Sequence, residues 1–520
     1  MNRLSHLVSD FSRVALLAAL SLSLCLLYLS IKVSHRIFSS YQRLINSVAD
    51  HRSFTLQSTS TCPRTILYQA HWSDSLVEYH TRPSRLLRIQ KLEELHKKYG
   101  PVVRVGPNEV SISDWRHLRT IYLNTKGMIK SPDFYEAATF VGKDNIFQMI
   151  NVQQHAARRK MSSPPYSLQS VALLDPLIKG NAQRLARRLK SGTSSPVDAY
   201  SMCGLFSLEV ICQAGFAKDF SNDTNGAAAL KLLQAMDGSA LTLLFDGALP
   251  LVARFGIGSK LPGVIGDSYR KHEYWREKSY EMVDHFLEKS ADDEKYLLTP
   301  LATGIDGYLG RKLTHEELVE EAMGYMFAGS GTTSSTLTYL LYELSKPENA
   351  AIQEQLRAEV LAIPGDDIVA IRNNAYINAV IKETFRAHPT IISTIPRLLT
   401  EPLTLGQYTL PSGTVIGMQN WLHHHDASVF PEPEKFIPDR WLNETSEMKS
   451  ALTPFSLGKR NCIGQNLAWQ ELYWAVSEVM RSGSRFRVAD EMKDWEMEME
   501  DRFNIAPRGR RLMLTVSPVD

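Results

Sequence analysis

The pattern of apolar and polar positions divides the chain into an apolar run near the N-terminus, an irregular stretch, and a long regular remainder. Residues 14–31 are apolar apart from three serines, and as a helix they would extend over about 27 Å, enough to cross a bilayer. Residues 34–72 are rich in Ser and Thr and show little periodicity, which is typical of a linker. From residue 74 the pattern becomes regular, so we expect one folded domain over 74–520.

Short elements are predicted at the start of this domain. Residues 87–99 have a helical pattern that ends at Gly100. Two short apolar runs, 102–105 and 110–112, flank a turn signal at 106–108. This arrangement predicts a helix followed by two paired strands.

Longer helices dominate the rest of the pattern. Thr314 and Glu317 have the spacing of a capping box, which predicts the start of a helix that ends before Lys346-Pro347. A further helix is expected over 374–388, where a proline stops it, and a further β region near 403–415. The expected fold class is therefore mainly α with a small β subdomain.

The composition of the chain limits the kinds of partner and the cellular compartment that we expect. The chain has 520 residues, 44% of them hydrophobic, and a formal net charge of +2. A core of substantial size is expected, and no nucleic-acid partner is implied by so balanced a charge. The five cysteines are scattered and odd in number, which argues against a disulfide framework and favours a reducing compartment.

The apolar run at 14–31 has two interpretations, a membrane anchor or a cleaved signal peptide. The run is longer than a usual signal core, and no clear A-x-A cleavage site follows it, so the anchor is favoured. Arg3 and Arg13 precede the run, and Lys32 and Arg36 follow it. Because the basic residues are nearly balanced, charge does not fix the orientation.

One cysteine, Cys462, has an unusual setting. Gly458 and Gly464 permit tight turns and close approach to a bulky ligand, and the helical pattern that follows would favour a thiolate through its N-terminal dipole. Thiolate is an axial ligand of haem iron, whereas an isolated cysteine is by default a buried structural residue. Together with Phe455 and Arg460 the run has the pattern F-x-x-G-x-R-x-C-x-G. This pattern resembles the haem-binding loop of the cytochrome P450 family, and the resemblance favours the haem ligand.

The long predicted helix contains two glycines within 328–333, which reads Ala-Gly-Ser-Gly-Thr-Thr. Each glycine inside a helix costs up to about 1 kcal/mol relative to alanine, so a compensating role is expected. One interpretation is close packing against another helix. The other is a local widening of the helix that opens a groove for dioxygen.

A carboxylate between two guanidinium groups is the next candidate. Glu383 and Arg386 lie three residues apart on one face of the predicted helix, and Arg440 follows within the run Pro-Asp-Arg-Trp. Such a network is rigid and charge-assisted. We expect these three residues to support the cysteine loop and not to act as catalysts.

In this order, the E-x-x-R pair, the P-x-R-W run and the cysteine loop resemble the cytochrome P450 family over roughly residues 74–515. The resemblance implies the cytochrome P450 fold, preceded by one transmembrane helix, and a haem-thiolate monooxygenase of the microsomal, filamentous-fungal type. It implies a haem b whose iron is bound by Cys462. The run 328–333 resembles the family's A-G-x-(D/E)-T-T, which implies a role for Thr332 in proton delivery to oxygen.

Gly331 departs from that family pattern, because it stands where an acid is usual. Water, or the hydroxyl groups of Ser330 and Thr333, would then substitute. The haem propionates need cations or other donors, for which the resemblance offers Arg460, Arg397 and Arg159. The expected haem contacts are Phe455, Gly458, Arg460, Cys462, Gly464, Arg397, Arg159, Ala328 and Gly329.

Substrate contacts are also implied only by resemblance. They would come from residues 140–147, Phe327, Thr332, 391–394 and 503–506. These residues are largely apolar, which fits a lipophilic substrate but equally fits a protein core.

The resemblance implies oxidation of a lipophilic substrate with dioxygen. Only 520 − 462 = 58 residues follow Cys462, too few for a flavin domain, so electrons would come from a separate NADPH-cytochrome P450 reductase, with cytochrome b5 as a further candidate donor. The expected location is the endoplasmic-reticulum membrane, single-pass, with a cytosolic catalytic domain. The expected context is secondary metabolism of terpenoids, alkaloids or polyketides. Two alternatives stay open: a haem-thiolate isomerase or dehydratase that needs no external electrons, and a non-enzymatic haem- or lipid-binding membrane protein.

Overall fold

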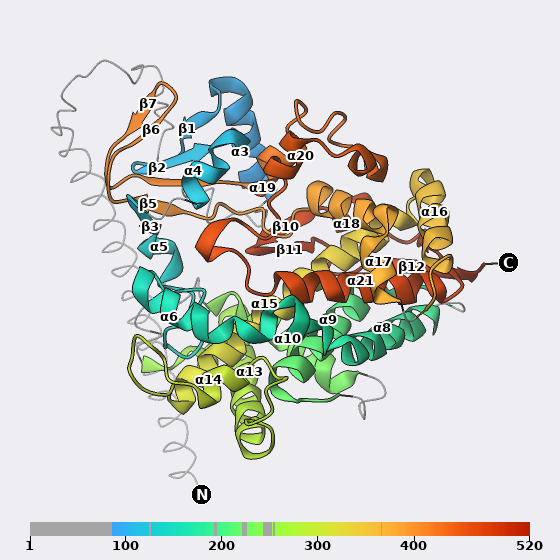
Figure 1. Ribbon diagram of the computed structural model, residues 1–520, viewed down its shortest axis with the longest axis horizontal. Helices are drawn as coiled ribbons and strands as arrows, with labels where there is room; N and C mark the ends of the chain where they lie inside the picture. Colours follow the sequence, from blue (N-terminus) through green and yellow to red (C-terminus); the bar gives the residue numbers. More distant parts are fainter. Residues whose placement is uncertain are drawn as a thin grey trace, which may run out of the picture. The chain divides into compact units, whose positions relative to one another are not determined.

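In the computed structural model, helices build most of the described part of the chain (Figure 1). The predicted membrane helix at 14–31 and the linker at 34–72 lie outside the described residues. The structure describes residues 86–123, 126–191, 195–220, 226–242, 252, 255–365 and 367–519.

Most of the α-helices are joined by short connections, and several of them are long. Their bounds are α3 (Leu86–Tyr99), α4 (Leu118–Tyr122), α5 (Pro132–Tyr135), α6 (Val152–Ser162), α7 (Leu168–Ala172), α8 (Asp175–Lys190), α9 (Ala199–Phe216), α10 (Ala227–Ser239), α13 (Gly263–Lys289), α14 (Thr299–Thr303), α15 (His315–Ser345), α16 (Ala350–Leu361), α17 (Ile368–Asn373), α18 (Ala375–Ala387), α19 (Asn420–His424), α20 (Ser446–Ala451) and α21 (Gln465–Arg481).

The strands form small sheets. The largest sheet has the order β1-β2-β8-β5-β3, a second has the order β4-β12-β9, and β10-β11 and β6-β7 are hairpins. In the largest sheet only β2 and β8 run parallel. The strand bounds are β1 (Val102–Arg104), β2 (Glu109–Ile112), β3 (Met128–Lys130), β4 (Val197–Asp198), β5 (Arg397–Leu399), β6 (Leu403–Leu405), β7 (Tyr408–Leu410), β8 (Val415–Met418), β9 (Ser484–Val488), β10 (Met499–Arg502), β11 (Asn504–Pro507) and β12 (Met513–Pro518).

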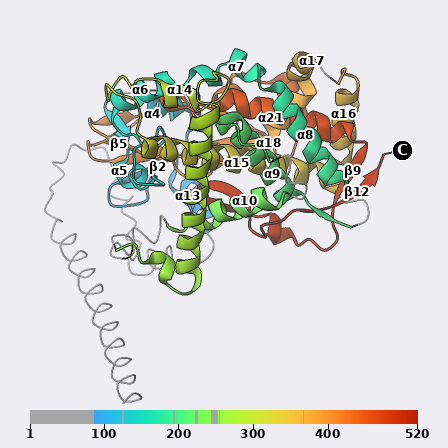
Figure 2. The same ribbon diagram turned by 90° about the horizontal axis from the view of Figure 1, so that it is seen from below.

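Helix α15 is the central element of the helical part. Its predicted capping box is confirmed, because the Thr314 hydroxyl accepts from the backbone N–H of Glu317 and the Glu317 carboxylate accepts from that of Thr314. Most of its residues are buried, and it contacts α9, α13, α18 and α21. Helix α8 packs on α21 (Figure 2). The expected fold class, mainly α with small β-sheets, is confirmed.

Helix α9 is, among the described residues, the one helix whose length and apolar character would allow it to cross a membrane. It has 18 residues with a mean hydropathy of 1.2, and 78% of it is buried inside the protein. An all-round apolar helix covered by other helices is typical of a protein core. Its contacts with α15, α8 and α10 are consistent with that role.

Candidate active site

The cysteine loop is a tight turn that ends at the start of α21. The backbone N–H of Cys462 donates to the carbonyl of Phe455 over 2.9 Å, which closes the loop. Gly458 has a φ of +73°, and a Cβ atom there would lie 2.5 Å from the backbone oxygen of Tyr122. Only glycine fits this position. Gly464, by contrast, has ordinary backbone angles and room for a side chain.

Cys462 has both an accessible side chain and the electrostatics of a buried one. Its side chain is exposed, yet burial raises the pKa of the thiol, while the backbone N–H of Gly464 and the charge of Arg159 act to lower it. A side chain that lines a space inside the molecule has both properties, because its surface is accessible while protein atoms surround it. The donor and the cation are groups that favour the thiolate.

Helix α6 holds the loop from the side. Arg159 donates from both terminal nitrogens to Asn461, over 2.7 Å to the backbone oxygen and 2.9 Å to Oδ1. Its donors are therefore directed at the residue before Cys462. His155 lies one turn earlier on the same helix, and burial together with the charges of Arg460 and other cations lowers its pKa to about 3, so its imidazole is neutral at physiological pH.

Three cations from distant parts of the chain lie close together near the loop. Lys130 of β3 and Arg397 of β5 are buried, and Arg460 is partly buried. Burial, and then repulsion from Arg460 and Arg397, lowers the pKa of Lys130 well below its usual range. Burial and the charge of Arg397 lower the pKa of Arg460 to about 10.

Within the described part of the chain, no carboxylate forms an ion pair with any of these three cations. Arg460 donates to the carbonyls of Met149 and Ile150, over 2.6 and 3.1 Å, and Arg397 donates to Tyr135 and Pro396. Neutral acceptors do not balance clustered positive charge in a buried site. An anionic group would do so, and the two propionates of a haem fit this requirement.

The segment 328–333 of α15 is a continuous α-helix, so the expected widening of the helix is not present as a change of helix type. Thr332 donates its hydroxyl hydrogen to the carbonyl of Ala328 over 2.8 Å, and Ser330 does the same to Met326 over 2.7 Å. Ala328 is exposed and Thr332 is partly exposed, although this helix is largely buried. Their surface is thus open to a bound group.

Gly329 fits the other interpretation of a glycine inside this helix, which is close packing against another helix. A Cβ atom there would lie 2.6 Å from the Cγ1 atom of Ile211 on α9. The glycine therefore permits close packing of α15 against α9. This contact supports the packing interpretation for Gly329.

A buried carboxyl group that the sequence reasoning missed lies next to this segment. Glu471 of α21 is buried, and burial raises its pKa well above its usual range, while a hydrogen bond from Thr333 acts in the opposite direction. Among the described residues, its Oε2 atom has no hydrogen-bond partner. An acidic residue among the mostly apolar buried residues of α21 was the available signal for this group.

The structure brings together Glu383, Arg386 and Arg440. Both oxygens of Glu383 accept from Arg386 over 2.9 Å, and one also accepts from Arg440 over 3.3 Å. The carboxylate further accepts from the indole N–H of Trp441 and the backbone N–H of Ile437, each over 2.8 Å. The sequence reasoning did not include these last two donors.

Four aromatic side chains from three of the expected substrate segments meet in one cluster. Phe140 contacts Phe327, Phe327 contacts Phe503, and Phe503 contacts Phe147, with ring centroids 5.7, 6.4 and 5.3 Å apart. None of these four rings is fully buried. They therefore offer an apolar surface to a lipophilic molecule.

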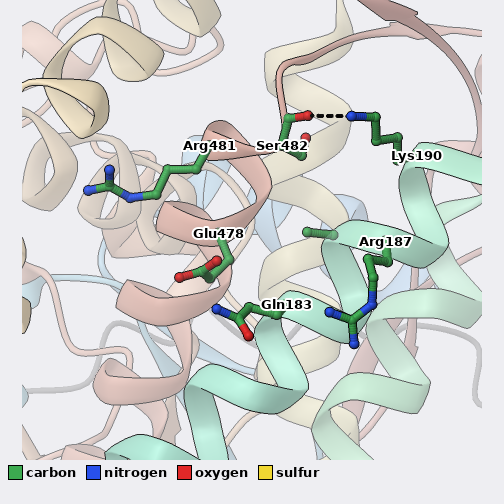
Figure 3. A pocket seen from close by; sticks show the side chains of 7 residues that line it. Gln183, Arg187, Lys190, Glu478, Arg481 and Ser482 are labelled. Carbon is green, nitrogen blue, oxygen red and sulfur yellow. Dashed lines mark hydrogen bonds between the residues drawn. The ribbon is translucent and has the colours of Figure 1, made fainter. Parts of the chain in front are cut away.

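A separate surface pocket lies between α8 and the C-terminal end of α21 (Figure 3). Arg187 and Lys190 line it from α8, with Glu478 and Arg481 from α21. About 13 helical residues separate Glu478 from the start of α21, roughly 20 Å along the axis. This pocket is therefore distant from the cysteine loop.

Solved structures define the class of fold. A retinoic acid-bound cyanobacterial protein, CYP120A1, superimposes with a TM-score of 0.69 at 17% identity, covering 82% of this chain and 94% of its own. The haem domain of cytochrome P450DA superimposes equally well, with a TM-score of 0.69, 17% identity, and coverage of 85% and 94%. At these identities the likeness shows the fold alone.

The family model described as "Cytochrome P450" matches residues 78–513. The chain therefore belongs to the cytochrome P450 family, and it is a haem-dependent monooxygenase. Similar curated proteins are the cytochrome P450 monooxygenase orf2 of Aspergillus niger, 27% identical with 85% of this chain and 90% of the relative covered, and the cytochrome P450 monooxygenase stcB of Emericella nidulans, 28% identical with coverage of 83% and 84%.

Proposed function

We propose that Cys462 binds the iron of haem b as a thiolate and that the protein hydroxylates a lipophilic substrate with dioxygen in fungal secondary metabolism. The setting of Cys462 carries this proposal: an accessible sulfur inside the protein, an N–H donor and a cation beside it, and unbalanced cations nearby. The filamentous-fungal sources of the similar monooxygenases support the metabolic context.

Four basic residues near Cys462 would have separate roles around the haem. Arg159 fixes the loop through Asn461, and Lys130, Arg397 and Arg460 would hold the propionates. When bound, haem supplies the activation of dioxygen and the oxidation of a C–H bond. The protein contributes ligation, orientation and control of protons.

Proton control would centre on Thr332. Its hydroxyl hydrogen is held by the carbonyl of Ala328, which leaves the lone pairs of Oγ1 to accept a hydrogen bond from water. Ser330 is buried with its hydroxyl directed at Met326, and Thr333 contacts Glu471. Of the three hydroxyl groups, that of Thr332 is therefore the best placed to meet a bound group.

Electrons would come from NADPH through a separate reductase, with cytochrome b5 as a second donor. Lys459 is exposed in the loop before Cys462, and a cation there would attract an acidic flavoprotein to the thiolate side. We further propose that residues 14–31 anchor the protein as a single pass in the endoplasmic-reticulum membrane, with the catalytic domain, residues 74–520, in the cytosol.

The reduced carbon-monoxide difference spectrum of the full chain in membranes tests the haem-thiolate assignment. We expect a strongly red-shifted Soret band that Cys462→Ala abolishes. Cys203→Ala, which alters a buried cysteine of α9, is the matched control and should retain the band. A red-shifted band that persists in Cys462→Ala would overturn the assignment.

A further inference from the structure

The β10–β11 turn follows one face of helix α15. Phe327, Gly331 and Ser335 are successive i, i+4 positions on that face. The ring of Phe503 stacks on Phe327, and the hydroxyl of Ser335 donates to the carbonyl of Ile505 over 2.6 Å. Asn504, between these two residues of the turn, therefore meets the helix at Gly331.

Gly331 provides the space that Asn504 occupies. A Cβ atom at residue 331 would lie 2.6 Å from Nδ2 and 3.3 Å from Cγ of Asn504. Real Cβ atoms essentially never come that close to another heavy atom. Any side chain at 331, including the acid that is usual in the family, would displace the amide of Asn504.

The turn itself is held firmly in place. Arg502 forms an ion pair with Asp237 of α10 over 2.8 Å, and the hydroxyl of Ser393 donates to Asp501 over 2.7 Å. The backbone N–H of Ile505 donates to the carbonyl of Thr390 over 2.8 Å. Because two separate segments, α10 and residues 390–393, fix the turn, the position of the amide is set by the fold and not by its own contacts.

The amide of Asn504 retains its hydrogen-bonding capacity. Its side chain is only partly buried, and within the described residues neither its oxygen nor its nitrogen has a hydrogen-bond partner. The residue before it, Phe503, stacks on Phe327, so the amide belongs to a segment that contributes to the aromatic cluster. A polar group kept in such a place is available to a ligand.

We propose that Gly331 and Asn504 act as a pair that sets substrate specificity: the glycine leaves room for an amide that binds one oxygen of the substrate. This inference rests on the proposed monooxygenase function and names its substrate class, an apolar ring system with a single carbonyl or hydroxyl group. The aromatic cluster contacts the rings, and the amide donates to the carbonyl or accepts from the hydroxyl. Asn504 is thus a specificity-determining residue that takes no part in the chemistry.

Three planar probes of nearly equal shape test the pair: fluorene, 9-fluorenone and 9-fluorenol. Their dissociation constants are measured on the full-length holoenzyme from the change in Soret absorption. We expect at least one of the two polar probes to bind about tenfold more tightly than fluorene, the factor for one hydrogen bond. Asn504→Leu, which keeps the branched shape of the side chain but removes its hydrogen-bonding atoms, should reduce the ratio to within about twofold.

Gly331→Ala tests the role of the space without removing the amide. The added Cβ should push the flexible end of Asn504 away and reduce the ratio as Asn504→Leu does. Gly324→Ala is the matched control, because a Cβ atom there would meet only Phe140, at an ordinary 3.8 Å, and the ratio should be unchanged.

A wild-type protein without preference, or a preference that survives in Asn504→Leu, would overturn the amide as an anchor. A preference that survives in Gly331→Ala would overturn the role of the glycine. The reduced carbon-monoxide spectrum is recorded for every variant. Loss of its red-shifted band already in the wild type would instead overturn the haem-thiolate assignment, so the two failures are distinguishable.

Discussion

A single buried side chain, Glu383, connects several separate segments of the protein through hydrogen bonds. It is fully buried, and its two oxygens accept from Arg386, Arg440, Trp441 and the backbone of residue 437. Removing one partner of a buried ion pair leaves a charge without compensation, which costs about 3–5 kcal/mol. The cost is larger than the value of the pair, because the arginines remain buried.

Glu383→Ala should therefore lower the free energy of unfolding by about 3–5 kcal/mol, measured by urea denaturation. Glu94→Ala is the control, because it also removes an i,i+3 ion pair but one whose side chains are each 66% exposed. The control should change the free energy by less than about 1 kcal/mol. Equal effects of the two substitutions would contradict the structural role of Glu383.

Single residues also show where sequence reasoning stops. The contacts of Glu383 with Arg386 and Arg440 could be predicted, since two of the three residues are neighbours on one helix and the third belongs to a known pattern. The contact of Glu471 with Thr333 could not, because it joins two helices whose mutual orientation no local signal specifies. The same limit applies to Asn504 and Gly331.

At the scale of elements, α15 and α21 are joined by a buried carboxyl group, that of Glu471, which contacts Thr333. The pKa of Glu471 is raised well above its usual 4.5 in the folded protein, whereas in the unfolded chain it titrates near that value. The contribution of this group to stability is therefore complete below about pH 4.5. It declines as pH rises, because only the unfolded chain then releases the proton, until the folded pKa is reached.

Between pH 5 and 8, the wild-type protein should lose stability relative to Glu471→Gln, by at most about 1.4 kcal/mol per pH unit. The difference in the free energy of unfolding, followed by urea denaturation across this range, measures it. Glu277→Gln alters an exposed glutamate of α13 and should leave the pH dependence as it is in the wild type. Parallel curves for wild type and Glu471→Gln would show that Glu471 ionises in the fold.

Local signals explain why many elements were predictable. The capping box at Thr314 and the turn between β1 and β2 are encoded within a few residues, and both have the expected bounds to within a residue or two. The pairing of β2 with β8 and of β3 with β5 joins distant segments. No periodicity within one strand specifies such a partner.

At the scale of the whole molecule, we expect the proposed membrane attachment to depend on residues 14–31, since the apolar helix α9 is largely buried within the protein. Deleting residues 1–33 should shift the protein from the membrane pellet to the supernatant, by on the order of tenfold in the ratio of the two. Fractionation by ultracentrifugation, with immunoblotting, measures this ratio.

Leu20→Arg with Leu24→Arg tests the same attachment in the full-length chain. Each charge near the centre of the run costs about 2.5–3.5 kcal/mol on insertion, so the double variant should behave like the deletion. Retention of both variants in the pellet would assign the attachment to another part of the chain.

The cluster of Lys130, Arg397 and Arg460 has a consequence for biosynthesis. Burial and mutual repulsion act against the charges of these residues, so we expect the protein to be less stable without an anion at this cluster. If Lys130, Arg397 and Arg460 hold the haem propionates as proposed, bound haem would offset that repulsion and stabilise the fold around them. The supply of haem in the producing cell, more than the rate of translation, would then limit the yield of folded protein.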